Sequence, residues 1–566
     1  MKRATIGLSL SLALAACTGM PAAPQHDAAR DADTREGEAF STYLSARFAS
    51  SQHDLSQAAH YYGRSLDNDP ANPGLLAASF FYATTAGDFD AAGKYAERVV
   101  AATPDDRTAR LALAVMAFKR KDYADARKNL TLSAKNPYTV LTLSLFDSWA
   151  AAAVHDEAGV AKDVEALSAQ KGAENMAIFQ SALLSEYLGK NEAAEAAYKK
   201  ALGGGAVTPR VLDAYGRFLE SHGRSAEAQA LYTSHLGESG LSVVTGPALA
   251  RLAARQKAEP LIRTPEDGAA EALFGIAASL TDPQSADSSI LYLRLAMYLR
   301  PDLALGNILL ADRFESLGKF DNAIAVYYSI PQDSPYYRMA AVEAAIDESR
   351  MGRNDAAIAG LKKLVAFAPK DAEGWIALGD SYRGADRYDA AVDAYDHAEK
   401  ALGTPLRKDC TLYYARAMAK ERLHRLDASE ADIQAALKLS PEQPELLNYL
   451  GYSWVDRGRN IPQALGMLEK ARSLRPYDGY IVDSVGWAYY RLGRFNDAAT
   501  TLEQAVLLVP GDPTINDHFG DALWRAGRHI DARFQWNHAI TFGAAGDEKS
   551  KIEAKLKYGL TSGGKS

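Results

Sequence analysis

The octapeptide WIALGDSY occupies residues 375–382, and related patterns of small and aromatic residues return along the chain at intervals of 34. Ala391, Tyr395 and Ala398 follow in the second half of the same period. Columns of glycine and alanine mark places where two helices approach too closely for large side chains, and the aromatic rings fill the spaces between them. We therefore expect helices that pack closely against one another in each period.

A column of small residues repeats this spacing over most of the 566 residues. Its members are Ala58, Ala92, Ala126, Val160, Ala194 and Ala228, then Ser289, Ala323, Ala357 and Ala391, then Ala464, Ala498 and Ala532. A fixed period of about 34 residues is the sequence signature of a repeat solenoid. We expect repeats to begin near residues 39, 73, 107, 141, 175, 209, 270, 304, 338, 372, 410, 445, 479 and 513.

The residues within one period resemble the tetratricopeptide repeat, whose signature is W-x₂-L-G-x₂-Y followed by alanine, an aromatic residue and alanine. Trp375, Leu378, Gly379 and Tyr382 match the first half of that signature. Other copies carry Leu450-Gly451-Trp454, Val485-Gly486-Tyr489 and Phe519-Gly520. The resemblance implies an all-α fold, a superhelical solenoid of antiparallel helix pairs.

The repeat loses its phase between Ala228 and Ser289, where several proline and glycine residues interrupt the pattern. Such residues break the stacking of helices, so we expect an irregular joint there. After the last repeat, charged and apolar residues alternate at helical spacing, which suits the polar-faced cap of an open solenoid. The predicted segments are an N-terminal array at 39–242, the joint at 243–269, a C-terminal array at 270–546, and a capping helix and tail at 547–566.

The first residues of the chain resemble an export signal. Lys2 and Arg3 precede a short apolar stretch that ends Leu14-Ala15-Ala16-Cys17, which resembles the signal of bacterial lipoproteins. The resemblance implies a signal peptide at 1–16, an acylated Cys17 and, by composition, a flexible tether at 17–38. Because Thr18 stands where inner-membrane lipoproteins often carry aspartate, it also implies the periplasmic face of the outer membrane. An ordinary secretory peptide with a coincidental cysteine is the alternative.

Composition excludes several classes of protein. With 63 basic and 71 acidic residues the formal charge is −8, which disfavours a nucleic-acid scaffold. Two cysteines cannot form a disulfide framework, and Cys410 is expected to be a small buried hydrophobic residue. The chain lacks the common catalytic, nucleotide-binding and metal-binding motifs. We therefore expect a protein that is not an enzyme and that uses no cofactor or metal.

In tetratricopeptide arrays the first helix of each repeat lines the concave groove, and the resemblance carries the groove positions onto the last repeats of this chain. The candidate partner-binding residues are Asn448, Tyr452, Asp483, Trp487, Tyr490, Arg491, Asp517, Asp521, Trp524 and Arg525. A band of aromatic residues with carboxylates suits an extended or helical peptide. The alternative is that the polar residues cap or bridge helices while the aromatic residues pack locally.

The expected function is that of a non-enzymatic periplasmic scaffold that binds proteins or peptides. The plan is similar to outer-membrane lipoprotein adaptors that bring a carboxyl-terminal processing protease to cell-wall hydrolases. An assembly factor for outer-membrane proteins or exported polysaccharide is an alternative. The array could also be the substrate-recognition arm of an enzyme complex, or a cytoplasmic co-chaperone. The sequence makes no prediction of the partner's identity or of the oligomeric state.

Overall fold

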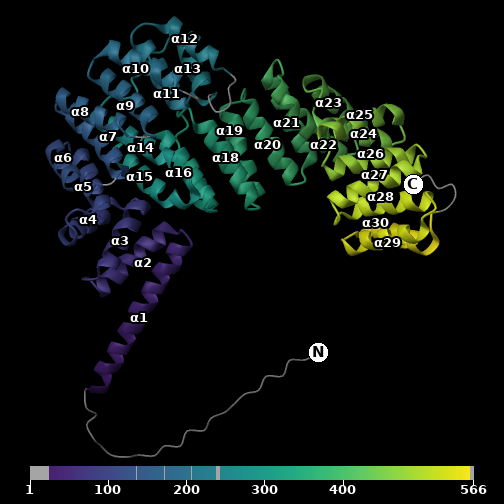
Figure 1. The fold of residues 1–566 in the computed structure, drawn as a ribbon, viewed down its shortest axis with the longest axis horizontal. Helices are drawn as coiled ribbons and strands as arrows, with labels where there is room; N and C mark the ends of the chain where they lie inside the picture. Colours follow the sequence, from purple (N-terminus) through teal and green to yellow (C-terminus); the bar gives the residue numbers. More distant parts are fainter. Residues whose placement is uncertain (1–24, 136, 171, 205–206, 237–241, 561–566) are drawn as a thin grey trace, which may run out of the picture. The chain divides into compact units, whose positions relative to one another are not determined.

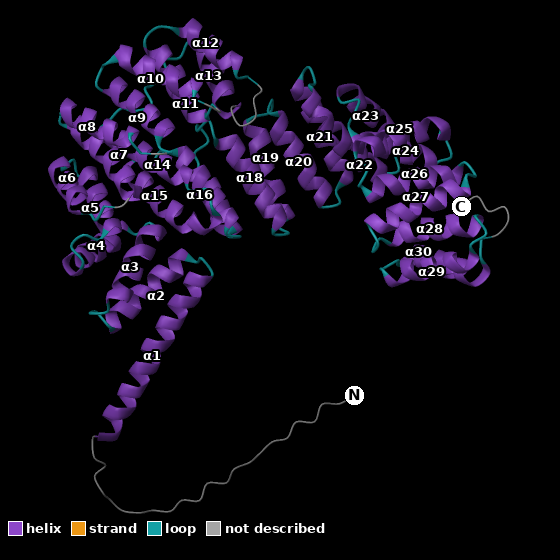
Figure 2. Ribbon diagram, viewed as in Figure 1, coloured by secondary structure: helices purple, strands orange, loops and turns teal. Residues whose placement is uncertain are grey.

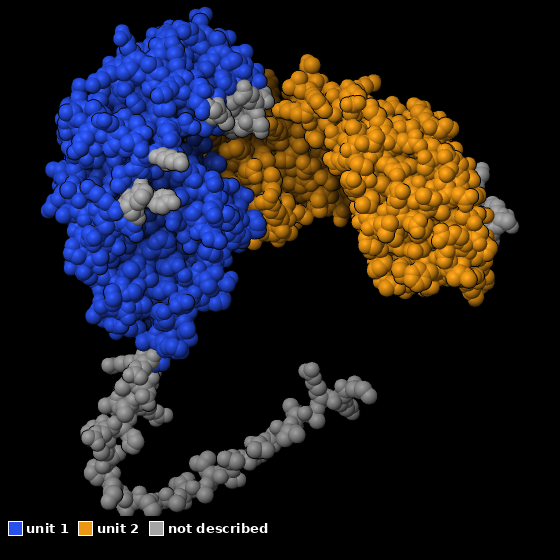
Figure 3. Space-filling view, in the orientation of Figure 1, with its two compact units in different colours: residues 1–322 blue, residues 323–566 orange. Residues whose placement is uncertain are grey.

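The computed structural model describes residues 25–135, 137–170, 172–204, 207–236 and 242–560 (Figures 1 and 2). Within these ranges it contains 30 α-helices and two short 3-10 helices, with no β-strand. The predicted all-α class is therefore confirmed. The chain divides into two compact units, residues 1–322 and 323–566 (Figure 3), and each unit is described separately below.

Unit 1 holds the helices up to α16. They are α1 (Gln25–Ser51), α2 (Leu55–Asn68), α3 (Pro73–Ala86), α4 (Phe89–Ala102), α5 (Arg107–Lys119), α6 (Tyr123–Leu132), α7 (Pro137–Ala153), α8 (Glu157–Ser168), α9 (Glu174–Tyr187), α10 (Asn191–Gly203), α11 (Pro209–Ser221), α12 (Ser225–Ser234), α13 (Ser242–Ala253), α14 (Pro265–Ser279), α15 (Ala286–Leu299) and α16 (Ala304–Ser316). A 3-10 turn, η1 (Pro283–Ser285), precedes α15.

Unit 2 begins within α17 (Phe320–Tyr328). Its further helices are α18 (Tyr337–Arg350), α19 (Asn354–Phe367), α20 (Ala372–Gly384), α21 (Tyr388–Leu402), α22 (Cys410–Arg422), α23 (Leu426–Leu439), α24 (Pro444–Asp456), α25 (Ile461–Leu474), α26 (Gly479–Arg491), α27 (Phe495–Leu508), α28 (Pro513–Arg525), α29 (His529–Thr541) and α30 (Gly546–Tyr558). A second 3-10 turn, η2 (Arg407–Asp409), precedes α22. From α18 to α29 consecutive helices pack against one another. The first helices α20, α22, α26 and α28 begin at the predicted starts 372, 410, 479 and 513.

The turn inside the early repeats has a recurring construction. An aspartate follows a residue in the left-handed region and caps the second helix, with its side chain accepting a hydrogen bond from a backbone N–H three residues later. These aspartates are Asp54, Asp88, Asp122 and Asp156, preceded by His53, Gly87, Lys121 and His155 at φ 50°, 89°, 63° and 56°. Each cap is worth about 1 kcal/mol of helix stability. The turn chemistry thus repeats with the same 34-residue period as the core.

The predicted close approaches of helices are present. Every member of the column of small residues is buried. A Cβ atom on Gly379 would lie 2.4 Å from the Tyr395 ring, and one on Gly520 would lie 2.5 Å from Trp536. Glycine is therefore required at both positions by the neighbouring helix. Cys410 is also buried and free, as expected, and burial raises the pKa of its thiol.

The division between the compact units differs from the predicted joint at 243–269. The chain turns back after α13, so that α14 packs against α7 and α9, and α15 packs against α3 and α5. A Cβ on Gly268 would lie 2.3 Å from the Trp149 ring, which is fully buried. The boundary therefore falls after Asn322, because the helix pair that follows the joint belongs to the core of unit 1.

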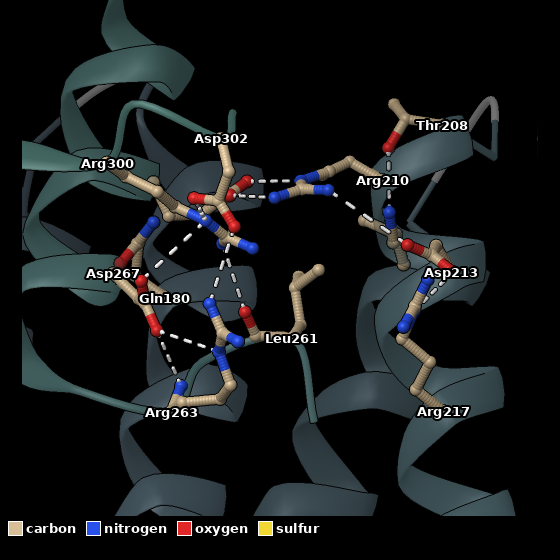
Figure 4. A network of polar contacts seen from close by, with 12 residues as sticks. Gln180, Thr208, Arg210, Asp213, Arg217, Leu261, Arg263, Asp267, Arg300 and Asp302 are labelled. Atoms are coloured by element: carbon tan, nitrogen blue, oxygen red, sulfur yellow. Dashed lines mark hydrogen bonds and ion pairs between the residues drawn. The ribbon is translucent and has the colours of Figure 1, made fainter. Parts of the chain in front are cut away.

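Polar contacts hold this folded-back segment (Figure 4). Arg210 on α11 donates two hydrogen bonds to the buried Glu271 of α14, one of 2.8 Å to Oε1 and a shorter one to Oε2. Asp267 closes a capping box with Thr264 at the start of α14, and its carboxylate lies 3.7 Å from Arg300 Nε. Proline and glycine thus mark a chain reversal here, and the reversal stays inside one unit.

The N-terminal helix is longer than the sequence indicates. Helix α1 begins at Gln25, so residues 25–38 of the predicted tether are helical. Alanine, arginine and glutamate in this stretch have high helix propensity, and the helix continues into the segment that packs on α2. The predicted signal peptide at 1–16 and Cys17 lie outside the described residues. Among the residues described, no helix has the combination of length and apolar character needed to cross a membrane.

Candidate functional site

A surface groove of about 470 Å³ crosses the first helices of four successive repeats in unit 2. Helices α22, α24, α26 and α28 supply its walls, and we call it the α22–α28 groove. Its lining residues are Tyr414, Glu421, Leu426, Glu445, Asn448, Tyr449, Tyr452, Ser453, Asp456, Arg457, Asp478, Tyr480, Ile481, Asp483, Ser484, Asp512, Thr514 and Ile515. The first helices line this groove, as the tetratricopeptide resemblance implies.

Three of the candidate residues meet in this groove: Asn448, Tyr452 and Asp483. They come from the middle of α24 and α26, where neighbouring repeats present equivalent positions. The Asn448 Oδ1 atom is buried and makes no hydrogen bond within the described part of the chain. An unsatisfied buried carbonyl oxygen costs free energy.

Tyrosines form the apolar part of the groove. Burial, followed by the nearby Asp456, Asp483 and Glu421 carboxylates, raises the pKa of Tyr452 to about 12. Burial and a hydrogen bond to Glu421 likewise raise the pKa of Tyr449. These phenols therefore stay neutral and serve as hydrogen-bonding aromatic surfaces at physiological pH. Tyr480, at the mouth of the groove, keeps 57% of its surface exposed.

Asp483 joins the groove to a buried aromatic cluster. Its carboxylate accepts the Nδ1–H of His518 at 3.0 Å and 3.1 Å, and the imidazole stacks on Trp487 at a centroid distance of 4.1 Å. Burial lowers the pKa of His518, but Asp483 together with Asp517 and Asp521 raises it by more, so the net shift is upward. Trp487 is 6% exposed and also stacks on Tyr490, so it belongs to the packing behind the groove.

The next pair of candidate carboxylates is occupied by the chain itself. Lys555 of α30 places its Nζ 2.8 Å from both Asp517 oxygens and 2.8 Å from Asp521 Oδ1. Asp521 also accepts the Trp536 indole N–H at 3.0 Å. Burial raises the pKa of Asp521, while Lys555 acts in the opposite direction. Asp517 and Asp521 therefore hold the last helix on the array and do not line the groove.

The remaining candidates also serve the fold. Trp524 packs on Trp536 and His529, and its ring contacts the position where a Cβ of Gly559 would stand. Arg491 donates from Nη1 to the Asp456 carbonyl at 3.0 Å, and Arg525 bonds Tyr490. The contacts of Trp487, Tyr490, Arg491, Asp517, Asp521, Trp524 and Arg525 are of the kind that the alternative describes, and their role in partner binding stays a prediction.

Several groove residues escape the sequence prediction. Tyr414 and Glu421 on α22 are seven residues apart, and Tyr449 and Asp456 on α24 have the same spacing. Seven residues make about two helical turns, so each pair shares one face of its helix. Asp478 and Asp512 recur 34 residues apart just before α26 and α28. These groove residues could be found in the sequence by looking for polar or tyrosine residues spaced seven apart within a first helix, or 34 apart from one first helix to the next.

Comparison with known proteins agrees with this architecture. Four segments, residues 82–134, 342–403, 414–478 and 486–548, match the family model described as Tetratricopeptide repeat. A TPR repeat-containing protein of Pseudomonas aeruginosa is 34% identical over 109 residues, or 19% of this chain and 18% of the relative. The cytochrome c-type biogenesis protein CycH of Rhizobium meliloti is 34% identical over 124 residues, or 21% of this chain and 31% of the relative. The matches thus span less than a third of either relative.

One solved structure with a similar chain serves for comparison. The crystal structure of the APC/C hetero-tetramer Cut9–Hcn1 has a chain that is 16% identical, with a TM-score of 0.37. The comparison covers 87% of this chain and 97% of that one.

Proposed function

We propose that this chain, four segments of which match the tetratricopeptide-repeat family model, is a non-enzymatic scaffold that binds partner proteins through the α22–α28 groove. The observation that carries the proposal is the groove itself, in which four first helices present tyrosines and polar groups on one open surface. Tyrosine side chains supply contact area with little loss of side-chain entropy, and hydroxyl and amide groups fix a peptide backbone.

The dimensions of the groove favour an extended segment of a partner. Neighbouring packed helices lie about 9 Å apart, so four first helices span roughly 30 Å. An extended chain advances about 3.4 Å per residue, so some eight or nine residues would cross the groove.

We propose that the scaffold lies at the periplasmic face of the outer membrane. This part of the proposal rests on the lipoprotein-like sequence that ends at Cys17. A lipidated cysteine with three acyl chains exceeds the two membrane signals that stable anchoring needs. By its similarity in plan to the lipoprotein adaptors of carboxyl-terminal processing proteases, the partners we propose are a periplasmic protease and its cell-envelope substrates.

Replacing Tyr452 and Tyr480 together with alanine should remove most partner binding while the helices stay intact. Both side chains line the groove, and truncation of aromatic residues at binding centres typically costs about 2 kcal/mol or more. Affinity capture from detergent-solubilised cells, quantified by mass spectrometry, measures the loss. Circular dichroism of the purified double variant measures whether the helices persist.

The matched control is Leu507→Ala with Phe534→Ala, which removes two exposed apolar side chains from α27 and α29. We expect this control to retain the partners that the wild type captures. Equal retention of partners by the groove variant and the control would exclude the groove as the binding surface.

A further inference from the structure

We infer that the α22–α28 groove selects extended polypeptide segments that carry lysine or arginine side chains. The inference rests on the proposed function, and it adds the chemical class of the ligand. Three observations carry it: an internal lysine held by two carboxylates of the last repeat, an excess of uncompensated carboxylates in the groove, and tyrosine rings beside them.

The last repeat shows how this array binds a cation. Lys555 enters between Asp517 and Asp521, and its ammonium contacts both carboxylates. Asp517 stands 34 residues after Asp483, at the equivalent position of the next repeat. Helix α30 therefore binds the repeat surface as an internal ligand. It also lies next to the groove, because the hydroxyl of Thr514, a lining residue, donates a hydrogen bond of 3.4 Å to Glu548 Oε1 of α30.

The groove holds more negative charge than its own basic residues neutralise. Six carboxylates line it against one guanidinium. The guanidinium of Arg457 forms an ion pair with Glu430, with 2.5 Å between Nη2 and Oε2. Glu445 is paired with Arg475, and Asp483 is paired with His518. Among the described residues, Glu445 and Asp483 are thus the groove carboxylates that contact a basic side chain.

Four carboxylates remain without a basic side chain in contact among the described residues. They are Glu421, Asp456, Asp478 and Asp512. Glu421 accepts the Tyr449 hydroxyl, and Asp478 and Asp512 accept backbone N–H groups as helix caps. Asp456 is exposed in the last turn of α24, with Arg491 on its carbonyl oxygen. Glu421 and Asp456 lie in the last turns of α22 and α24, and Asp478 and Asp512 lie just before α26 and α28, so all four first helices bring a carboxylate to the groove.

The tyrosine rings of the groove also favour the binding of lysine and arginine side chains. Aromatic faces attract ammonium and guanidinium groups, and this attraction strengthens when the site excludes water. The half-buried rings of Tyr414, Tyr449 and Tyr452 lie among the carboxylates just described. A lysine or arginine side chain therefore finds both an aromatic surface for its stem and a carboxylate for its charge.

Fluorescence anisotropy with three labelled ten-residue peptides tests the inference on the purified full-length chain in detergent. The peptides alternate alanine with lysine, glutamine or glutamate, so they share length and flexibility and differ in charge. We expect the lysine peptide to bind at least about tenfold more tightly than the glutamine peptide, and its affinity to fall as salt rises. We expect the glutamate peptide to bind most weakly.

A neutralised groove supplies the second arm. Asp456→Asn, Asp478→Asn and Asp512→Asn remove three charges, and asparagine still caps the helices at 478 and 512. The control, Asp497→Asn with Glu503→Gln and Asp531→Asn, makes the same change of net charge on α27 and α29. The lysine peptide should bind the groove variant about tenfold more weakly and the control with unchanged affinity.

Each other outcome overturns the inference in a distinct way. Equal affinity for the glutamine and lysine peptides would refute the charge preference and leave the groove as a general peptide site. Equal weakening by the two triple variants would assign the effect to the overall charge of the protein. If none of the peptides binds while Tyr452→Ala with Tyr480→Ala still reduces partner capture, the ligand class is wrong and the proposed function stands. If that tyrosine variant also has no effect, both fail.

Discussion

Replacing Lys555 with methionine is expected to destabilise unit 2 by about 3 kcal/mol or more, because removing one partner of a buried ion pair leaves its counter-charges uncompensated. Asp521 is 2% exposed, and Asp517 lies beside it on the same ammonium. Thermal and urea unfolding of the variant, followed by circular dichroism, measures the loss. Hydrogen exchange should show that α30 opens first, since Lys555 is its main polar link to the array.

The loss of folding stability caused by Lys555→Met should increase as pH rises. Burial raises the pKa of Asp521 even with Lys555 present, and removing the ammonium raises it further. A carboxyl group whose pKa is raised in the folded state contributes stability at low pH that is lost as pH rises through the folded pKa. The variant should therefore be closest to wild type at pH 4 and furthest from it above pH 7.

The control for this experiment is Lys557→Met, two residues further along α30 on an exposed side chain. Its effect should stay within about 0.5 kcal/mol. A Lys555 variant as stable as the Lys557 variant at neutral pH would contradict the role of the Asp517–Asp521–Lys555 cluster.

The second large effect is expected in unit 1, where Trp149→Ala should cost about 3–5 kcal/mol. Trp149 is 0% exposed, lies against Gly268 of the folded-back α14, and donates its indole N–H to Gln180 at 2.9 Å. The substitution creates a cavity and leaves the Gln180 amide oxygen without its partner. Urea unfolding monitored by circular dichroism measures the change.

Because α14 closes over Trp149, the substitution should also release the α14–α15 pair. We expect faster hydrogen exchange in both helices and new sites of limited proteolysis between α13 and α14. Phe48→Ala, which removes a side chain that is 68% exposed on α1, is the control and should change stability by less than about 0.5 kcal/mol. Unchanged exchange in α14 together with a small loss of stability would show that the reversal does not depend on this contact.

The sequence predicts most of the fold because each repeat encodes its own geometry. The 34-residue spacing of small residues fixes where the helices approach, and glycines such as Gly379 and Gly520 permit the contact with the next helix. Periodicity reports neighbours along the chain and carries no information on contacts between distant repeats. The return of α14 onto α7, through Gly268 and Trp149, is such a distant contact, and this is why the predicted joint and the observed boundary differ.

The candidate site is predicted less completely, for a related reason. Position within the repeat places Asn448, Tyr452 and Asp483 on the groove, and the structure brings them together there. Equivalent positions one repeat later are covered by α30, which the sequence predicts as a cap without indicating which surface it covers. A polar residue at a groove position is therefore a ligand-binding candidate only where no later helix packs upon it.

Site-specific photo-crosslinking in intact cells tests most directly whether the α22–α28 groove binds the partner. Benzoylphenylalanine replaces Tyr480, which is 57% exposed in the groove, or Phe534, which is 59% exposed on α29, so the two probes have nearly equal access to solvent. We predict a discrete crosslinked protein from position 480 and none from position 534. Crosslinks of equal yield from both positions, or from position 534 alone, would contradict binding in the groove.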